Sequence, residues 1–254
     1  MITQYKAKIK SSLKYLSVLN HHRNKGFCPI CDRKTLFVEY GSWLRDQYKC
    51  IKCNSIPRNR ALIQALKLFV PKYKQLLIHE SSPGSRSSDY LKRECLNYSS
   101  SQYFPDVTPG QIHQGFRCEN LENLTFSDAS FDLFITQDVF EHIMHPDKAF
   151  REIARVLKPG GMHIFTMPWY PELKHTRQRA AIKEGEIKYL EEAIYHGNPV
   201  SNKGSLVTYD WGSDFADYVY KHSRMSTTIY LHVDRSLGLD AMYLQVFISK
   251  KSYE

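Results

Sequence analysis

The chain has 254 residues, enough for one moderate α/β domain and a small accessory module. Its hydrophobic content of 42% and mean hydropathy of −0.46 are ordinary for a soluble globular protein, and no apolar run is long enough to span a bilayer. The net charge of +9 favours anionic partners, namely nucleic acid, phosphorylated glycans or acidic membrane surfaces, without choosing among them.

Residues 1–24 are predicted to form a basic helix, because they contain no acidic residue and their apolar residues recur at helical spacing. The helix either packs on the rest of the chain or anchors it to a membrane surface or nucleic acid. The segment lacks the apolar core and cleavage site of a signal peptide, which predicts a cytoplasmic, reducing location. There, cysteines are read as thiols or metal ligands. The apolar positions are Ile2, Tyr5, Ile9, Leu13, Leu16 and Leu19.

Two CxxC pairs follow, with eighteen residues between them. This spacing matches a four-cysteine zinc site, in which the thiolates form a closed tetrahedron around one structural ion. Redox dithiols and chance are the competing interpretations. Aromatic and β-branched residues between the pairs predict short strands, so residues 25–60 are predicted to be a zinc ribbon. The four predicted ligands are Cys28, Cys31, Cys50 and Cys53.

A connecting helix is predicted over residues 61–74, and the main domain over residues 75–254. Arg58 and Arg60 precede this helix, where they either face an anion or are solvated. In the main domain, QLLIHE, SQYFPD and FDLFIT each read as strands buried in a parallel sheet. Residues 131–168 combine a strand, a loop, a helix and a second strand, which is a right-handed crossover unit.

Within that unit, FDLFITQDVFEHI followed by AFREIARVLKPGGMHIFTMP resembles conserved blocks of class I S-adenosylmethionine-dependent methyltransferases. The Glu141–His142 pair and the RVLKPGG turn carry the match. The resemblance implies a Rossmann-like α/β sheet whose last strand is antiparallel, with S-adenosylmethionine as cofactor. The alternative is a βαβ unit of some other α/β enzyme.

The resemblance also implies a cofactor pocket along the carboxyl edge of the sheet. The loop SSPGS takes the position of the family's glycine-rich loop but keeps only one glycine, so serines would receive the amino acid part of the cofactor. Asp106 would bind the ribose or else form a turn, and Asn120 would read the adenine or else cap a turn. The predicted cofactor residues are His79, Glu80, Ser81, Ser82, Pro83, Gly84, Asp106, Asn120, Leu121 and Gln137.

Residues 169–214 exceed a minimal connection and are predicted to be a lid over the substrate, with a helix over 180–193. The whole chain resembles zinc-ribbon methyltransferases associated with surface-glycan biosynthesis. The predicted catalytic residues are His196, as first choice of general base, His142 and Asp138. The predicted substrate contacts are Arg177, Arg179, Asn198, Tyr209, Asp210 and Trp211.

Three hypotheses about function remain open. The first is O-methylation of a sugar or another small molecule that carries a hydroxyl group. The second is methylation of RNA, with the ribbon as a clamp. The third is a binding module that has the cofactor fold but no catalytic activity, which the glycine-poor loop motivates.

Overall fold

The computed structural model describes residues 20–198 and 201–253. The N-terminal module is an antiparallel sheet of β1 (Arg23–Cys28), β2 (Arg33–Glu39) and β3 (Tyr48–Cys50), with the one-turn helix α2 (Leu44–Gln47) before β3. Most of the basic helix predicted over 1–24 falls on residues 1–19, which lie outside the described residues. Its last two positions belong to β1.

The main sheet has the order β16-β17-β9-β8-β4-β5-β7-β6. β4 pairs in parallel with β5 and β8, and β8 pairs in parallel with β9, whereas β17 is antiparallel to β9. The mixed sheet with an antiparallel last strand is therefore confirmed. The strands are β4 (Leu77–Ser81), β5 (Asn97–Gln102), β6 (Ile112–His113), β7 (Phe116–Cys118), β8 (Phe131–Gln137), β9 (Leu157–Thr166), β16 (Ser226–Tyr230) and β17 (Val246–Lys250).

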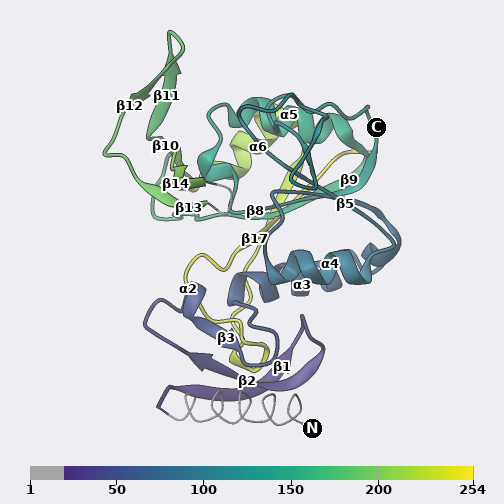
Figure 1. Ribbon diagram of the computed structural model, residues 1–254, viewed down its shortest axis with the longest axis vertical. Helices are drawn as coiled ribbons and strands as arrows, with labels where there is room; N and C mark the ends of the chain where they lie inside the picture. The colour runs from purple at the N-terminus through teal and green to yellow at the C-terminus, as the bar shows by residue number, and fades with distance from the viewer. Residues whose placement is uncertain (1–19, 199–200, 254) are drawn as a thin grey trace.

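Helices cover both faces of this sheet (Figure 1). Side chains alternate along β8, so that Leu133 and Ile135 join one apolar cluster and Phe134 joins the other. The first cluster includes α3 (Pro57–Phe69) and α4 (Arg86–Glu94), and the second includes α5 (Pro146–Val156) and α6 (Phe215–Ser223). The described residues also form three short 3-10 helices, η1 (Tyr73–Gln75), η2 (Phe140–His142) and η3 (Arg235–Leu237).

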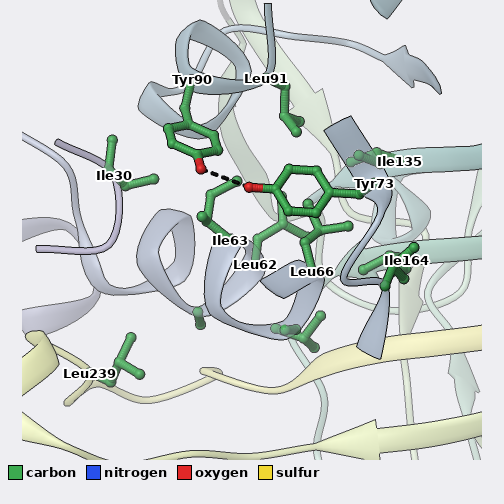
Figure 2. Packing of buried hydrophobic residues seen from close by; sticks show 14 of the residues in the cluster. Ile30, Leu62, Ile63, Leu66, Tyr73, Tyr90, Leu91, Ile135, Ile164 and Leu239 are labelled. Atoms are coloured by element: carbon green, nitrogen blue, oxygen red, sulfur yellow. Dashed lines mark hydrogen bonds between the residues drawn. The ribbon is translucent and has the colours of Figure 1, made fainter. Parts of the chain in front are cut away.

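The first apolar cluster also joins the N-terminal module to the sheet. Figure 2 shows Ile30 of the module and Leu239 of the C-terminal segment around the side chains of α3. The hydroxyl groups of Tyr73 and Tyr90 share a hydrogen bond of 2.7 Å at its edge. Burying one continuous apolar surface favours a fixed placement of the module on the sheet.

A buried arginine also links the module to the far end of the chain. Arg60 is fully buried, and its guanidinium donates to the carbonyl oxygens of Gly238, at 2.7 Å, and Tyr48, at 3.0 Å. Gly238 has a φ of +70°, and a Cβ there would lie 2.6 Å from the ring of Phe37. Arg60 is therefore neither solvated nor facing an anion.

The predicted helix over 180–193 is wrong. The segment forms a hairpin of β11 (Ala180–Lys183) and β12 (Glu186–Tyr189), which projects from the body in Figure 1. Glu184 and Gly185 both have positive φ, of 54° and 82°, as a two-residue hairpin turn requires. The insertion also contains β13 (Tyr195–Asn198) paired with β14 (Ser201–Leu206), and β10 (Arg177–Gln178) paired with β15 (Tyr209–Asp210).

Candidate active site

The carboxyl end of β8 is where the N-terminal module meets the main sheet. Asp138 follows β8 with a φ of +52°. Arg45 of α2 donates to its carboxylate at 2.7 Å, Arg58 of α3 lies 3.2 Å from it, and the Thr166 hydroxyl donates at 3.0 Å. Burial opposes ionisation, but the two guanidinium groups outweigh it and lower the pKa of Asp138. Asp138 is thus a paired carboxylate at an internal contact.

Glu141 lies one turn further on and has no such partner. Its side chain is buried, and neither carboxylate oxygen has a hydrogen bond among the described residues. Burial, together with the charge of Asp138, raises the pKa of Glu141 to about 8. The backbone is well fixed, because the Glu141 carbonyl oxygen accepts a 2.7 Å bond from the Thr208 amide, where the insertion returns.

Two histidines approach this carboxylate from different elements. His142 Nε2 lies 3.7 Å from Glu141 Oε1, and His196 Nδ1 on β13 lies 3.9 Å from the same atom. The two rings meet edge to face, with centroids 5.1 Å apart. The structure therefore brings His142 and His196 together, although 53 residues separate them in the sequence.

The tautomer of His142 follows from its surroundings. Its Nδ1 lies 2.8 Å from the Leu206 carbonyl oxygen, so Nδ1 carries the proton and Nε2 presents a lone pair toward Glu141. Burial lowers the pKa of His142 to about 4, and burial also lowers the pKa of His196. Both imidazoles are therefore neutral at pH 7, which is the form that accepts a proton.

Glu80 and Gln137, two predicted cofactor residues, meet at the carboxyl edge of β4 and β8. The Glu80 carboxylate accepts bonds from Gln137 Nε2 at 2.6 Å, the Tyr98 hydroxyl at 2.6 Å and Ser88 at 2.8 Å. Ser87 in turn donates to the Gln137 side-chain oxygen at 2.7 Å. The network connects three strands with the first turn of α4, and it satisfies the buried Glu80 within the protein.

The loop between β4 and α4 lies next to this network. Ser82 has a φ of +60° and donates its amide to Ser101 at 2.8 Å, while the Ser85 side chain accepts from the Ser88 amide and caps α4. A Cβ at Gly84 would meet no atom within 4 Å. Gly84 therefore faces open space, whereas Ser81 is buried.

Three other predicted cofactor residues, Asp106, Asn120 and Leu121, have different surroundings. Asp106 is exposed in a turn, because β5 ends at Gln102 and not at Asp106 as expected. The side-chain oxygen of Asn120 accepts from the Glu122 amide at 2.9 Å, which is the turn role held open above. Leu121 packs in the second apolar cluster.

His79 lies inside the main domain. Its ring is buried against Phe126, Phe131 and Phe134, and its nitrogens lie 2.9 Å from the hydroxyls of Ser99 and Ser101. Alternation along β4 places His79 on the opposite face from Glu80.

The predicted substrate contacts are largely bonded to one another. Asp210 is buried and accepts from Arg177 at 2.6 Å and from Arg179 at 2.8 Å. Trp211 is fully buried and stacks on Tyr209 at 5.0 Å. These five residues form the base of the insertion. Asn198 lies in β13, but its side chain is outside the described part of the structure.

The four cysteines of the N-terminal module converge, with sulfur atoms that all lie within 4.8 Å of one another. Cys28 and Cys53 are 3.7 Å apart, and Cys31 and Cys50 are 3.9 Å apart. Four sulfurs at about 2.3 Å from one zinc lie roughly 3.8 Å apart, so the donor set fits this ion. Each pair ends in a left-handed residue, Asp32 or Asn54, whose amide closes a turn on the first cysteine carbonyl.

Two residues at the candidate site, Glu141 and Arg45, have no role among the predictions from the sequence. Glu141 was noted for the family resemblance but given no role, although its place beside His142 was a usable signal. Arg45 reaches Asp138 from the N-terminal module, a contact that no local pattern predicts. Arg58 faces the Asp138 carboxylate, which is one of the two alternatives held open for it. A separate cavity of about 740 Å³ lies between the module and α3 and α4, lined by residues that include Lys67 and Arg93. It contains no predicted catalytic, cofactor or substrate residue.

Comparison with known proteins agrees with this fold. Residues 89–165 match the model of a methyltransferase domain family. The chain is 38% identical over 60 residues to the ubiquinone/menaquinone biosynthesis C-methyltransferase UbiE of Bartonella tribocorum, which is 21% of this chain and 23% of that protein. It is also 38% identical over 56 residues to the mitochondrial 2-methoxy-6-polyprenyl-1,4-benzoquinol methylase of Caenorhabditis elegans, which is 22% of this chain and 19% of that protein.

Among solved structures, a chain of the complex between the Haloferax volcanii Trm112 methyltransferase activator and a methyltransferase superposes with a TM-score of 0.50. The two are 13% identical, and the match covers 78% of this chain and 91% of that one. This likeness supports the Rossmann-like fold of class I methyltransferases. The sequence match to a methyltransferase domain is thus limited to residues 89–165, and the chain spans less than a quarter of the length of the curated relatives it matches.

Within residues 20–198 and 201–253, none of the helices has both the length and the apolar character needed to cross a bilayer.

Proposed function

We propose that this chain is an S-adenosylmethionine-dependent methyltransferase that O-methylates a sugar or another small hydroxyl-bearing molecule. The observation that carries the proposal is the position of the neutral His142–His196 pair. It lies beside the carboxyl end of β8, in a chain with a methyltransferase domain, and His196 belongs to the insertion. In open α/β sheets, ligands bind at that edge.

The cofactor belongs along the edge from Glu80 to Gln137, next to the open side of Gly84. When bound, S-adenosylmethionine supplies a methyl group that is already activated by its sulfonium. The chain must therefore orient the acceptor oxygen in line with this group and exclude water. His79 lies away from this edge and has no part in the proposed pocket.

The proton of the acceptor needs a base, because the oxygen's electron pair forms the new O–CH₃ bond as the S–CH₃ bond breaks. His196 is half-exposed on the insertion and is the first choice, and the lone pair on His142 Nε2 is the second. Either imidazole takes the proton and becomes a cation beside the side chain of Glu141. Asp138 is held by Arg45 and serves the site as a structural anion.

A structural zinc ion completes the proposal for the N-terminal module, held by Cys28, Cys31, Cys50 and Cys53. The distances between the sulfur atoms support it. Burial of Cys28 and Cys50 in the apolar cluster shared with α3 also supports a structural and not a catalytic ion.

The internally satisfied Glu80 network favours a second candidate, a binding module without catalysis. Glu80 and Gln137 already bond to protein groups, and the adjoining loop is poor in glycine. RNA methylation remains as a third candidate, supported by the charge of +9. It predicts RNA binding that weakens steeply as salt concentration rises.

Calorimetry with S-adenosylmethionine and S-adenosylhomocysteine separates the enzyme from the non-catalytic module. Gly84→Leu is the informative variant, because a Cβ at this position would meet no protein atom within 4 Å. The larger side chain would extend into the space beside the loop where the cofactor is proposed to bind. We expect unchanged thermal unfolding and cofactor binding weakened at least tenfold, with Gly84→Ala between Gly84→Leu and wild type. Failure of the wild-type chain to bind either compound would remove the proposed chemistry.

Turnover on a panel of sugars, followed as release of S-adenosylhomocysteine, tests the base. His196→Ala should lower turnover by about a hundredfold or more while cofactor binding stays intact. Unchanged turnover in this variant would exclude His196 from that role.

A further inference from the structure

Glu141, His142 and His196 form a cluster that is separate from the four cysteines. One ligand atom from each of the three residues lies within 4.8 Å of the other two. The residues come from η2 and from β13 of the insertion, and two imidazole nitrogens face the same oxygen, Glu141 Oε1, at 3.7 and 3.9 Å. These contacts are too long for hydrogen bonds, so the three groups surround a space without bonding across it.

The carboxylate of Glu141 lacks the partner that its burial requires. The residue is 1% exposed, and its two oxygens have no hydrogen-bond donor among the described residues. The nearest guanidinium groups, Arg45 and Arg58, are engaged with Asp138. A buried carboxylate is stabilised by a pairing charge or by a metal ion, and here two imidazole rings line the space in front of it.

His142 already has the orientation of a metal ligand. Its Nδ1–H donates to the Leu206 carbonyl oxygen at 2.8 Å, which fixes the ring and leaves Nε2 to face Glu141. Metal-binding histidines commonly have this second hydrogen bond to a backbone carbonyl, because it sets the tautomer and the direction of the lone pair. Thr208 holds the backbone of the same turn through the Glu141 carbonyl oxygen.

The distances between the three ligand atoms are close to those found around a bound metal ion. Ligand atoms at about 2.1 Å from one metal lie roughly 3.0–3.4 Å apart, so shifts of about half an ångström would close the cluster. His196 can supply the movement, because its ring is half-exposed on a hairpin strand, whereas Glu141 and His142 are fixed.

We propose that Glu141, His142 and His196 bind a second metal ion, a divalent first-row transition metal such as Mn²⁺, Co²⁺ or Zn²⁺. Two histidines and one carboxylate bind one side of such an ion and leave coordination positions for oxygen ligands. An acceptor with neighbouring hydroxyl groups would fill those positions, so the ion would orient the acceptor oxygen and favour loss of its proton to solvent. With the ion bound, the two imidazoles would be ligands and would not act as the base. This role rests on the proposed function, but ion binding does not.

The first test is a titration of the full chain, carrying its zinc, with Mn²⁺, followed by the loss of the free-ion signal in electron paramagnetic resonance. Mn²⁺ prefers oxygen and nitrogen ligands and leaves thiolates to zinc. We expect one Mn²⁺ bound per chain, and affinity at least tenfold lower in Glu141→Gln and in His196→Ala. Glutamine keeps the shape of the buried side chain, and His196 is on an exposed hairpin, so both variants should fold.

The matched control is His232→Ala, because His232 lies 3.9 Å from the Asp234 carboxylate in a similar pair outside the cluster. Its Mn²⁺ affinity should equal that of the wild type.

Cobalt offers a second readout, because a four-thiolate site gives an intense charge-transfer band and a histidine–carboxylate site gives only weak visible bands. Glu141→Gln should remove the weak bands alone.

Two results would overturn the proposal. The first is a wild-type chain that binds no Mn²⁺ and takes up only the cobalt of the four-thiolate site. The second is Mn²⁺ binding that is unchanged in Glu141→Gln and His196→Ala. Because cofactor binding is measured separately by calorimetry, a chain that binds Mn²⁺ but not S-adenosylmethionine would contradict the proposed function and leave the metal site standing.

Discussion

Arg45 donates to the carboxylate of Asp138 at 2.7 Å and also to the carbonyl oxygen of Tyr243 at 2.6 Å. Arg45 belongs to the N-terminal module and is 5% exposed, whereas Asp138 follows the central strand β8. The pair therefore fixes the module against the candidate active site.

A double-mutant cycle tests this pair. Asp138 keeps its contact with Arg58 and part of its contact with solvent when Arg45 is replaced. We therefore expect Arg45→Met to lower the free energy of unfolding in urea by about 2–3 kcal/mol. The coupling energy between Arg45→Met and Asp138→Asn should be about 1–2 kcal/mol. The exposed pair Arg86 and Asp89 is the control, with an expected coupling below about 0.5 kcal/mol. Equal coupling in the two cycles would contradict the role assigned to Arg45.

The buried histidines predict loss of stability in acid. Burial lowers the pKa of His163 to about 3 from an ordinary 6.5. Between these values the unfolded chain binds a proton that the folded chain excludes, so stability falls as pH falls from about 6.5 toward 3. The pKa values of His79 and His142 are lowered in the same direction, to about 3 and about 4.

His163→Phe isolates one of these protons. The ring of His163 stacks on Phe165 at 4.2 Å, so phenylalanine suits the site, although Thr136 loses a 3.0 Å hydrogen bond. We expect a loss of about 1 kcal/mol at pH 7 and a shallower decline in stability below pH 6.5. Thr136→Ala removes the same hydrogen bond but keeps the titrating ring. The stability of this variant should therefore fall with pH as steeply as that of the wild type.

Removal of the proposed zinc should unfold more than the ribbon. Cys28 and Cys50 share an apolar cluster with Leu62 and Leu66 of α3. We expect one zinc per chain by elemental analysis, and Cys50→Ser should lose the zinc together with part of the thermal stability of the main domain. Cys95 is a buried cysteine of the same apolar cluster but is not one of the four converging cysteines, so Cys95→Ala should keep its zinc. A zinc-free wild type would contradict the assignment.

The base of the insertion depends on one carboxylate. Asp210→Asn leaves the guanidinium of Arg179 buried without a counter-charge. We expect limited proteolysis within the insertion to accelerate on the order of tenfold, because local opening becomes easier. Arg177→Gln is the control, since Arg177 is half-exposed and its loss leaves the Arg179–Asp210 pair in place. Equal cleavage of both variants would argue against this role.

Local patterns predicted most of the main sheet. The apolar runs that became β4 and β8 are buried on both faces, and Ser85 caps α4 where a loop was expected to end. Each CxxC pair forms a short turn that holds its two sulfurs close together, and the four sulfurs converge as the spacing predicts. In these regions, the forces that choose the structure act between residues close in sequence.

Prediction failed where distant segments decide. AAIKEGEIKYLEEA contains many helix formers, but the Glu184–Gly185 turn and the anchoring of both ends of the insertion on the main domain select a hairpin. Likewise, Glu80 and Gln137 each look like a free ligand-binding group, and only the folded chain bonds them to each other. Arg45 reaches Asp138 across 92 intervening residues, a pairing that no periodicity records.

The hydrogen bonds from Arg60 to the Gly238 carbonyl oxygen have a consequence for synthesis on the ribosome. The guanidinium must remain without this acceptor until residue 238, which is 178 residues further along the chain, has been translated and has left the exit tunnel. The contact between the ribbon and the C-terminal segment is therefore completed late in translation, and nascent chains that stall between residues 60 and 238 should expose an unfinished ribbon to chaperones and proteases.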